Sequence, residues 1–234
     1  MKVEVLPDAA AAARRAATII AEDARAAVAA RGRFTMAVSG GKSPWVMLRE
    51  LANEVVPWKD VHVFQIDERV APAGDPNRNL THLTESLLSH APLPPSQIHA
   101  MPVEAADLEA AASAYAKTLE SLAGSPPALD LAHLGLGPDG HTASLVPGDP
   151  VLQVTDRDVA LTGVYQGHRR MTLTYPVLNR SRRILWLVTG ADKVPALARL
   201  RAADPSIPAG RVRQDAAVVI ADASAAGGAA AGQK

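Results

Sequence analysis

Short apolar runs alternate with longer amphipathic segments along most of the chain. Each apolar run is five or six residues long, which is typical of strands buried on both faces of a sheet. These predicted strands lie at 34–38, 61–66, 97–101, 129–134, 159–164, 171–175, 184–188 and 216–220. The segments between them predict helices at 8–30, 43–54, 78–89, 104–122 and 193–201. This alternation predicts an α/β fold with a mainly parallel sheet and helices on both faces.

Two of the predicted helices begin at recognisable caps. Asp8 can accept a hydrogen bond from the first turn of the 8–30 helix. Ser43 is followed by Pro44, so Ser43 is predicted to cap the next helix with proline at the first helical position.

The chain is predicted to fold as a single domain. It has 234 residues, no internal repeat and no low-complexity linker, so residues 1–222 are assigned to one α/β domain. Residues 223–234 are rich in Ala and Gly without periodic apolar positions, and this tail is predicted to be frayed. Charged residues interrupt the Ala-rich 9–30 segment, which argues against a membrane span. Because the N-terminus lacks a secretory pattern, the expected location is cytoplasmic.

Composition excludes several classes of function. Lys and Arg balance Asp and Glu at 24 each, so nothing points to nucleic acid or an anionic membrane as a partner. The absence of cysteine excludes disulfides, thiolate metal sites and a cysteine nucleophile. The scattered histidines lack metal-ligand spacing, and neither the P-loop nor the dinucleotide glycine pattern is complete. We therefore expect no metal, and neither ATP nor NAD is indicated. A monomer that binds a small molecule is favoured.

Four loops follow predicted strands and should fall at one edge of the sheet. They span 39–44, 67–79, 135–144 and 189–193. Open α/β sheets bind ligands at the edge that the carboxyl ends of the strands share. These loops are therefore expected to meet in one cleft.

The most distinctive loop reads Gly-Leu-Gly-Pro-Asp-Gly-His-Thr-Ala-Ser-Leu over residues 135–145. It places an acid, Asp139, two residues before an imidazole, His141, at the end of a predicted buried strand. That arrangement suits proton transfer. A glycine-rich turn with a surface histidine explains the loop equally well by itself. Ser144 is not in a Gly-x-Ser-x-Gly elbow, so a serine nucleophile is not indicated.

The loop after the first predicted strand suits an anion. Ser39, Gly40, Gly41 and Lys42 present backbone N–H groups next to a helix N-terminus, and such sites favour phosphate. An ordinary strand-to-helix turn that needs glycine is the alternative.

Cationic side chains in the other loops have two interpretations as well. Arg69, in the Asp-Glu-Arg triplet at 67–69, and the arginine pair at 169–170 offer forks that match phosphate oxygens. Solvated ion pairs are the alternative for both. Lys193 lies near a predicted helix start, where the dipole disfavours a cation unless an anion shares the site. A lysine that points into water is the alternative there.

Taken together, these segments resemble the 6-phosphogluconolactonases of the glucosamine-6-phosphate isomerase/6-phosphogluconolactonase family. The matching segments recur in family order and cover nearly the whole chain. They are 39–44, 67–69, Asn79, 135–145, 170–174 and 189–193. Val146 stands where the family commonly has phenylalanine, a departure that leaves the resemblance intact.

The resemblance implies a Rossmann-like α/β fold and hydrolysis of 6-phospho-D-glucono-1,5-lactone to 6-phosphogluconate in the oxidative pentose phosphate pathway. It implies no metal and no organic cofactor. Carried over by position, His141 is the general base that activates water, and Asp139 lies in the catalytic loop. The residues implied in binding the substrate and its phosphate are Ser39, Gly40, Gly41, Lys42, Asp67, Arg69, Asn79, Arg170 and Lys193.

Two other functions agree with parts of the sequence. Glucosamine-6-phosphate deaminases resemble the chain through the same fold and a similar histidine loop. They have an acidic residue where Val146 stands, and Asp-Glu-Tyr where 67–69 is Asp-Glu-Arg. A sugar-phosphate sensor joined to a DNA-binding domain is disfavoured, because the residues before 34 leave no room for a helix-turn-helix and because His141 is retained. These differences favour the lactonase.

Overall fold

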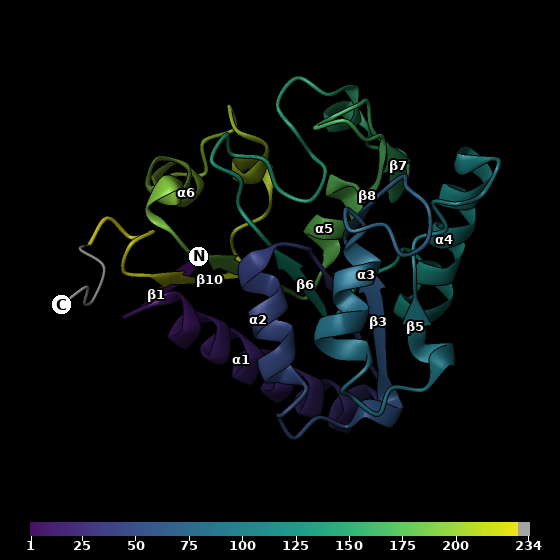
Figure 1. The fold of residues 1–234 in the computed structure, drawn as a ribbon, viewed down its shortest axis with the longest axis horizontal. Coiled ribbons are helices and arrows are strands. Elements are labelled where there is room, and N and C mark those ends of the chain that lie inside the picture. Colours follow the sequence, from purple (N-terminus) through teal and green to yellow (C-terminus); the bar gives the residue numbers. More distant parts are fainter. Residues whose placement is uncertain (229–234) are drawn as a thin grey trace.

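A seven-stranded parallel sheet runs through the computed structural model, which describes residues 1–228 (Figure 1). In spatial order its strands are β1 (Lys2–Leu6), β10 (Ala217–Asp222), β9 (Arg183–Val188), β6 (Leu131–Leu134), β2 (Phe34–Val38), β3 (Val61–Gln65) and β5 (Ile98–His99). Every neighbouring pair is parallel, so the carboxyl ends of all seven strands share one edge. The predicted α/β fold with a mainly parallel sheet is confirmed.

Helices cover both faces of the sheet, as predicted, because successive side chains of each strand enter two different apolar cores. In β6, for example, Leu131 belongs to the first core and Ala132 to the second. The first core includes residues of α1 (Ala9–Arg31), α2 (Lys42–Leu51), α3 (Asn79–Leu83) and the π-helical turn Thr84–Leu88. The second includes residues of α4 (Leu108–Ala123), α5 (Tyr175–Arg180) and α6 (Val194–Arg201). In Figure 1, α1 and α2 lie in front of the sheet.

A small antiparallel sheet stands at the carboxyl edge of the main sheet. Its strand order is β4 (Asp67–Arg69), β8 (Arg170–Leu173) and β7 (Val159–Leu161). The chain passes from β3 into it at Ile66, whose N–H donates to Val38 (3.0 Å) and whose carbonyl accepts from Leu173 (2.8 Å). The sequence predicted β7 and β8 as strands but not this pairing, because partners so far apart in the chain leave no local pattern.

Several strand predictions need correction. Residues 67–69, which were assigned to a loop, form β4. Residues 2–6 form β1, although no strand was predicted there. This edge strand is only partly buried, so its sequence lacks the continuous apolar run of the central strands. The strand predicted at 97–101 contains only two residues, Ile98 and His99, after a short 3₁₀ turn.

Helix starts were predicted with mixed success. Asp8 caps α1 as expected, because its carboxylate accepts from the Ala11 N–H (2.7 Å). Ser43 does not cap α2. Gly41 holds the N-cap position, and the Ser43 hydroxyl pairs instead with the hydroxyl of Thr189. Helix α5 was not predicted. Its first residue, Tyr175, is the last residue of the apolar run 171–175, which was interpreted as a strand.

The end of the chain is described only in part. Residues 223–228, assigned by prediction to the frayed tail, form turns in which the Gly228 N–H donates to the Ala223 carbonyl (2.8 Å). The rest of that predicted tail, 229–234, lies outside the described residues. Within residues 1–228, no helix is long and apolar enough to cross a membrane, and no three His, Asp or Glu side chains are grouped to hold a metal ion.

A buried histidine should make the fold sensitive to acid. His133 in β6 is fully buried, and this burial lowers the pKa of its imidazole from 6.5 to about 3. In the unfolded chain, His133 therefore binds a proton near pH 6.5. In the folded chain, it binds that proton only near pH 3. We expect the free energy of unfolding to fall as the pH drops through this window, by at most about 1.4 kcal/mol per pH unit from this group. Urea unfolding measures the slope, and a His133→Leu variant with an unchanged slope would contradict this account.

Candidate active site

A cleft of about 510 Å³ lies where the predicted loops meet at the carboxyl edge of the main sheet. Ten of the eleven residues singled out from the sequence line it. They are Ser39, Gly40, Gly41, Lys42, Asp67, Arg69, Asn79, His141, Arg170 and Lys193. The eleventh, Asp139, contacts His141 instead of the cleft. The fold thus brings together residues from the four segments predicted as loops and from β8.

His141 and Asp139 form a hydrogen-bonded pair. Asp139 Oδ1 accepts from His141 Nδ1 (2.6 Å) and from the His141 backbone N–H (3.1 Å). Because an ionised carboxylate only accepts, Nδ1 carries the ring proton of the neutral imidazole, and in that form Nε2 keeps its lone pair. The His141 side chain is 23% exposed, so water can reach it. Burial raises the pKa of Asp139, but the hydrogen bonds and charge of His141 outweigh burial and hold that pKa below its usual value.

Gly137 leaves the space in which this pair forms. A Cβ at this position would lie 2.1 Å from His141 Nδ1 and 2.6 Å from Asp139 Oδ1. The Gly137 N–H also donates to the His141 carbonyl (2.8 Å), which closes the loop on itself. The glycine is therefore required by its close approach to the pair.

Two arginines stand side by side on the small sheet. Arg69 in β4 is paired in register with Arg170 in β8, so both side chains leave the sheet on the face that lines the cleft. Within residues 1–228, the buried Nε atoms of both lack a hydrogen-bond partner. Like charges directly opposite each other repel, which favours an anion beside them. Asp67, buried in the same wall, offsets part of this positive charge and accepts from the Ser144 hydroxyl (2.6 Å).

The buried carboxylate of Glu68 holds together the two ends of the segment between β4 and α3, where the cleft residues Arg69 and Asn79 lie. It accepts from the backbone N–H groups of Arg69 (2.8 Å), Asn79 (2.7 Å) and Leu80 (2.8 Å), and it pairs with Arg78 Nε (3.2 Å). Asn79 in turn accepts from Arg69 Nη1 (2.7 Å). The charged triplet is therefore not a solvated ion-pair cluster. The sequence analysis missed the role of Glu68, because most of its partners lie beyond the following loop, at the start of α3.

The loop before α2 is held closely against its neighbours. Gly41 has a φ of +131°, a conformation that favours glycine. A Cβ on Gly40 would lie 2.0 Å from Asn79 Oδ1, so this glycine permits the contact between two cleft loops. The Ser39 hydroxyl donates to a β6 carbonyl (3.0 Å), which fixes the loop to the sheet. Lys42 begins α2 and is exposed at the cleft.

Lys193 has an anion beside it. Its Nζ lies 2.8 Å from Asp192 Oδ2, and Lys193 occupies the N-cap position of α6. Asp192 therefore offsets the unfavourable placement of a cation at a helix start. Asp192, Thr189 and Ser43 also line the cleft. The sequence analysis did not single them out as site residues, although all three lie in segments that it had marked.

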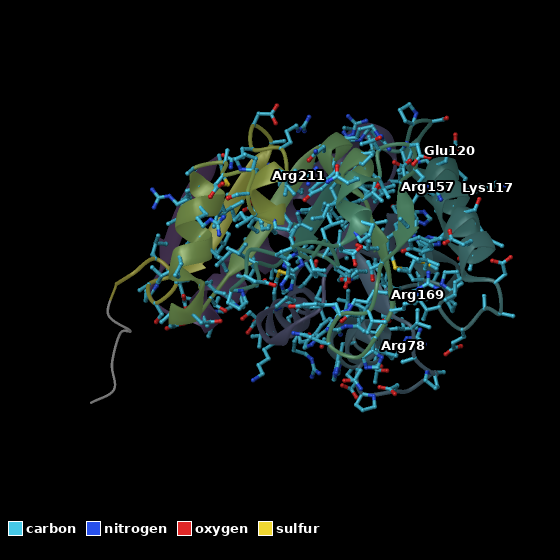
Figure 2. All side chains as sticks on the ribbon, turned by 90° about the horizontal axis from the view of Figure 1, so that it is seen from above. Arg78, Lys117, Glu120, Arg157, Arg169 and Arg211 are labelled. Carbon is cyan, nitrogen blue, oxygen red and sulfur yellow. The ribbon has the colours of Figure 1, made fainter. Side chains whose placement is uncertain are left out.

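The side chains of Arg169 and Arg170 point in opposite directions, because neighbouring side chains of an extended chain lie on opposite sides. Arg170 lines the cleft and is 4% exposed. Arg169 is exposed, and its Nε donates to the Thr162 carbonyl (3.3 Å). Figure 2, seen from above, labels Arg169 on the same side of the molecule as Arg78. Only Arg170 of the pair belongs to the cleft.

Tyr165 is a contact of the site that the sequence analysis missed. Its hydroxyl donates to Asp139 Oδ2 (3.3 Å), and its ring stands edge-on to the His141 ring with 5.6 Å between centroids. The Arg170 guanidinium lies over the same ring, 5.0 Å from its centroid. A single tyrosine in a polar turn carries no sequence signal for such a position.

Comparison with known proteins agrees with this geometry. The family model described as glucosamine-6-phosphate isomerases/6-phosphogluconolactonase matches residues 7–220. A 6-phosphogluconolactonase of Synechocystis sp. is 42% identical in an alignment of 185 residues that covers 76% of this chain and 77% of the relative. A 6-phosphogluconolactonase of Mycobacterium tuberculosis is 39% identical in an alignment of 224 residues that covers 88% of this chain and 89% of the relative.

Solved structures share the fold. The 6-phosphogluconolactonase of Thermotoga maritima is 27% identical with a TM-score of 0.84, covering 94% of this chain and 98% of that chain. A monomeric glucosamine-6-phosphate deaminase is 21% identical, also with a TM-score of 0.84, covering 97% of this chain and 99% of that chain. At that identity the second likeness concerns the fold alone. By the extent of the family match and the identity of its relatives, this chain belongs to the glucosamine-6-phosphate isomerase/6-phosphogluconolactonase family.

Proposed function

We propose that this protein hydrolyses 6-phospho-D-glucono-1,5-lactone to 6-phosphogluconate, as a 6-phosphogluconolactonase of the pentose phosphate pathway. The observation that carries the proposal is the His141–Asp139 pair at a cleft that also contains Arg69 and Arg170. A base for water and cations for a phosphate are what this substrate requires. Relatives at 42% and 39% identity bear the name of this activity.

The chemistry needs one positioned base. A lactone carbonyl is already electrophilic, so no covalent nucleophile is required. Nε2 of His141 takes a proton from water as the water oxygen bonds to C1. The tetrahedral intermediate then breaks its bond between C1 and the ring oxygen, and the imidazolium returns the proton to that oxygen. Asp139 keeps the imidazole in the correct tautomer and stabilises its charged form.

The cations act at the other end of the substrate. Arg69, Arg170 and Lys193 bind the phosphate, together with Lys42 and the N–H groups at the start of α2. The phosphate is remote from C1, so these contacts orient the ring for attack. The cytoplasmic location and the monomeric state remain predictions.

Deaminase chemistry is not supported by the same cleft. The buried Val146 offers no carboxylate to assist a ring-opening histidine, and Arg69 stands where the deaminases have tyrosine. The likeness to a deaminase structure therefore does not extend to the reaction.

Two assays on one preparation test the proposal. The first follows lactone hydrolysis after subtraction of the spontaneous rate, and the second follows ammonia release from glucosamine 6-phosphate. We expect acceleration of lactone loss and no detectable ammonia. Ammonia release at a comparable rate, or lactone loss at the spontaneous rate, would reject the proposed function.

A Gly137→Ala variant tests whether the catalytic pair depends on its glycine. The added Cβ must displace the imidazole or the carboxylate of Asp139 by about 1 Å, so we expect kcat to fall by roughly 10- to 50-fold. Gly135→Ala is the matched control in the same loop, because a Cβ there meets nothing within 4 Å. Steady-state kinetics give kcat for both variants. Equal kcat values would contradict the claim that the His141–Asp139 pair needs the space that Gly137 leaves.

A further inference from the structure

We infer that Tyr165 is a positioning residue that fixes the Asp139–His141 pair and links it to Arg170. The inference rests on the proposed function, because it concerns how the same site is held for catalysis. Its evidence is a set of contacts that no other side chain of the described residues makes in combination.

The residue sits in an exposed hairpin beside the cleft. An isolated bridge pairs Tyr165 with His168, and the turn between them places Gln166 (φ +50°) and Gly167 (φ +83°) in the left-handed region. The neighbouring Val164 is 73% exposed. Tyr165 joins this exposed hairpin to the catalytic loop through its contacts with Asp139 and His141.

The hydroxyl of Tyr165 completes the hydrogen bonding of Asp139. One carboxylate oxygen, Oδ1, receives both donors of His141. The other, Oδ2, accepts from the Tyr165 hydroxyl (3.3 Å). A carboxylate held at both oxygens cannot rotate freely about its Cβ–Cγ bond. The hydroxyl therefore fixes the orientation of Asp139 and, through it, the orientation of the His141 ring.

The ring and backbone of the same hairpin hold Arg170. The guanidinium lies over the Tyr165 ring at 5.0 Å, and its Nη2 donates to the Tyr165 carbonyl and to Gln166 Oε1, both at 3.4 Å. Arg170 is one of the two arginines proposed to bind the phosphate. Tyr165 is thus in contact with the acid–base pair through its hydroxyl and with a phosphate ligand through its ring.

The two contacts can be separated by substitution. Tyr165→Phe keeps the ring and removes only the hydroxyl, so kcat should fall by about three- to tenfold while KM stays unchanged. Tyr165→Leu also removes the aromatic face, so KM for the phosphorylated lactone should rise by about two- to fivefold in addition. Val164→Ala is the matched control, because it changes the same hairpin without touching either contact, and both constants should keep wild-type values.

A spectroscopic measurement tests the positioning independently of turnover. The Nδ1 proton of His141, assigned by its loss in His141→Asn, should exchange with water faster in Tyr165→Phe than in the wild type or in Val164→Ala. The other charged groups that line the cleft, Lys42, Asp67, Arg69, Arg170, Asp192 and Lys193, are the same in all three proteins. A difference in exchange therefore reports the removed hydroxyl.

The outcomes separate this inference from the proposed function. Lower kcat with unchanged KM and faster proton exchange in Tyr165→Phe would support the positioning role. Wild-type kcat and exchange in that variant, in a protein that hydrolyses the lactone, would overturn the inference and leave the function standing. A wild-type protein without lactonase activity would reject the function, and the exchange rates would still decide whether Tyr165 holds the pair.

Discussion

Replacing His141 with asparagine is expected to lower kcat for 6-phosphogluconolactone by about 10²–10⁴-fold, the range for loss of a general base. Asparagine keeps a polar side chain in the loop but cannot take the proton from water. Binding of 6-phosphogluconate should change little, because the proposed phosphate contacts lie on β4, on β8 and at the starts of α2 and α6. The coupled assay gives kcat, and calorimetry gives the affinity for the product.

A matched control and a double variant sharpen this test. His90 is exposed and does not line the cleft, so His90→Asn should keep wild-type kcat. Asp139 acts through His141, so adding Asp139→Asn to His141→Asn should lower kcat little further. A folded His141→Asn protein with wild-type kcat would remove this residue from the mechanism.

Replacing Arg170 with methionine is expected to weaken binding of 6-phosphogluconate by about 10- to 150-fold, which corresponds to a charge-assisted hydrogen bond of about 1.5–3 kcal/mol. Methionine retains an unbranched apolar stem in the buried wall, so the change removes mainly charge and donors. Affinity for unphosphorylated gluconate should fall much less. Titration calorimetry with both ligands measures the difference.

The neighbouring arginine provides the control. Arg169 faces away from the cleft, so Arg169→Met should leave both affinities close to those of the wild type. Equal losses in the two variants would mean that general positive charge, and not the position of Arg170, governs binding. Equal losses for phosphorylated and unphosphorylated ligands would mean that Arg170 is not a phosphate ligand.

Local patterns predicted the parts of the fold that depend on local physics. Central strands such as 34–38 and 184–188 are buried on both faces, and continuous apolar runs identify such strands. Asp8 caps α1 through neighbouring residues, so its role is visible in the sequence. The edge strand β1 and the antiparallel sheet depend on partners far along the chain, and neither leaves a comparable local signal.

The candidate site, too, was predicted only in the parts that depend on local sequence. The motifs at 39–44 and 135–145 identified loops that do meet at one cleft. The motifs did not reveal contacts between residues that are distant in the sequence. The buried carboxylate of Glu68 accepts from the backbone N–H groups of both Arg69 and Asn79. The hydroxyl of Tyr165 donates to Asp139 from a separate hairpin. The choice between Arg169 and Arg170 also needed the structure, because it depends on which side of β8 faces the cleft.

The central claim is that one cleft both binds a phosphate and hydrolyses the lactone attached to it. The most direct test is the ratio of kcat/KM for 6-phosphogluconolactone to that for unphosphorylated gluconolactone, measured on the wild-type protein with spontaneous hydrolysis subtracted. At least two charge-assisted contacts to the phosphate predict a ratio of about 10² or more. A ratio near one would contradict the claim, because the arginines and lysines of the cleft would then contribute nothing to recognition of the substrate.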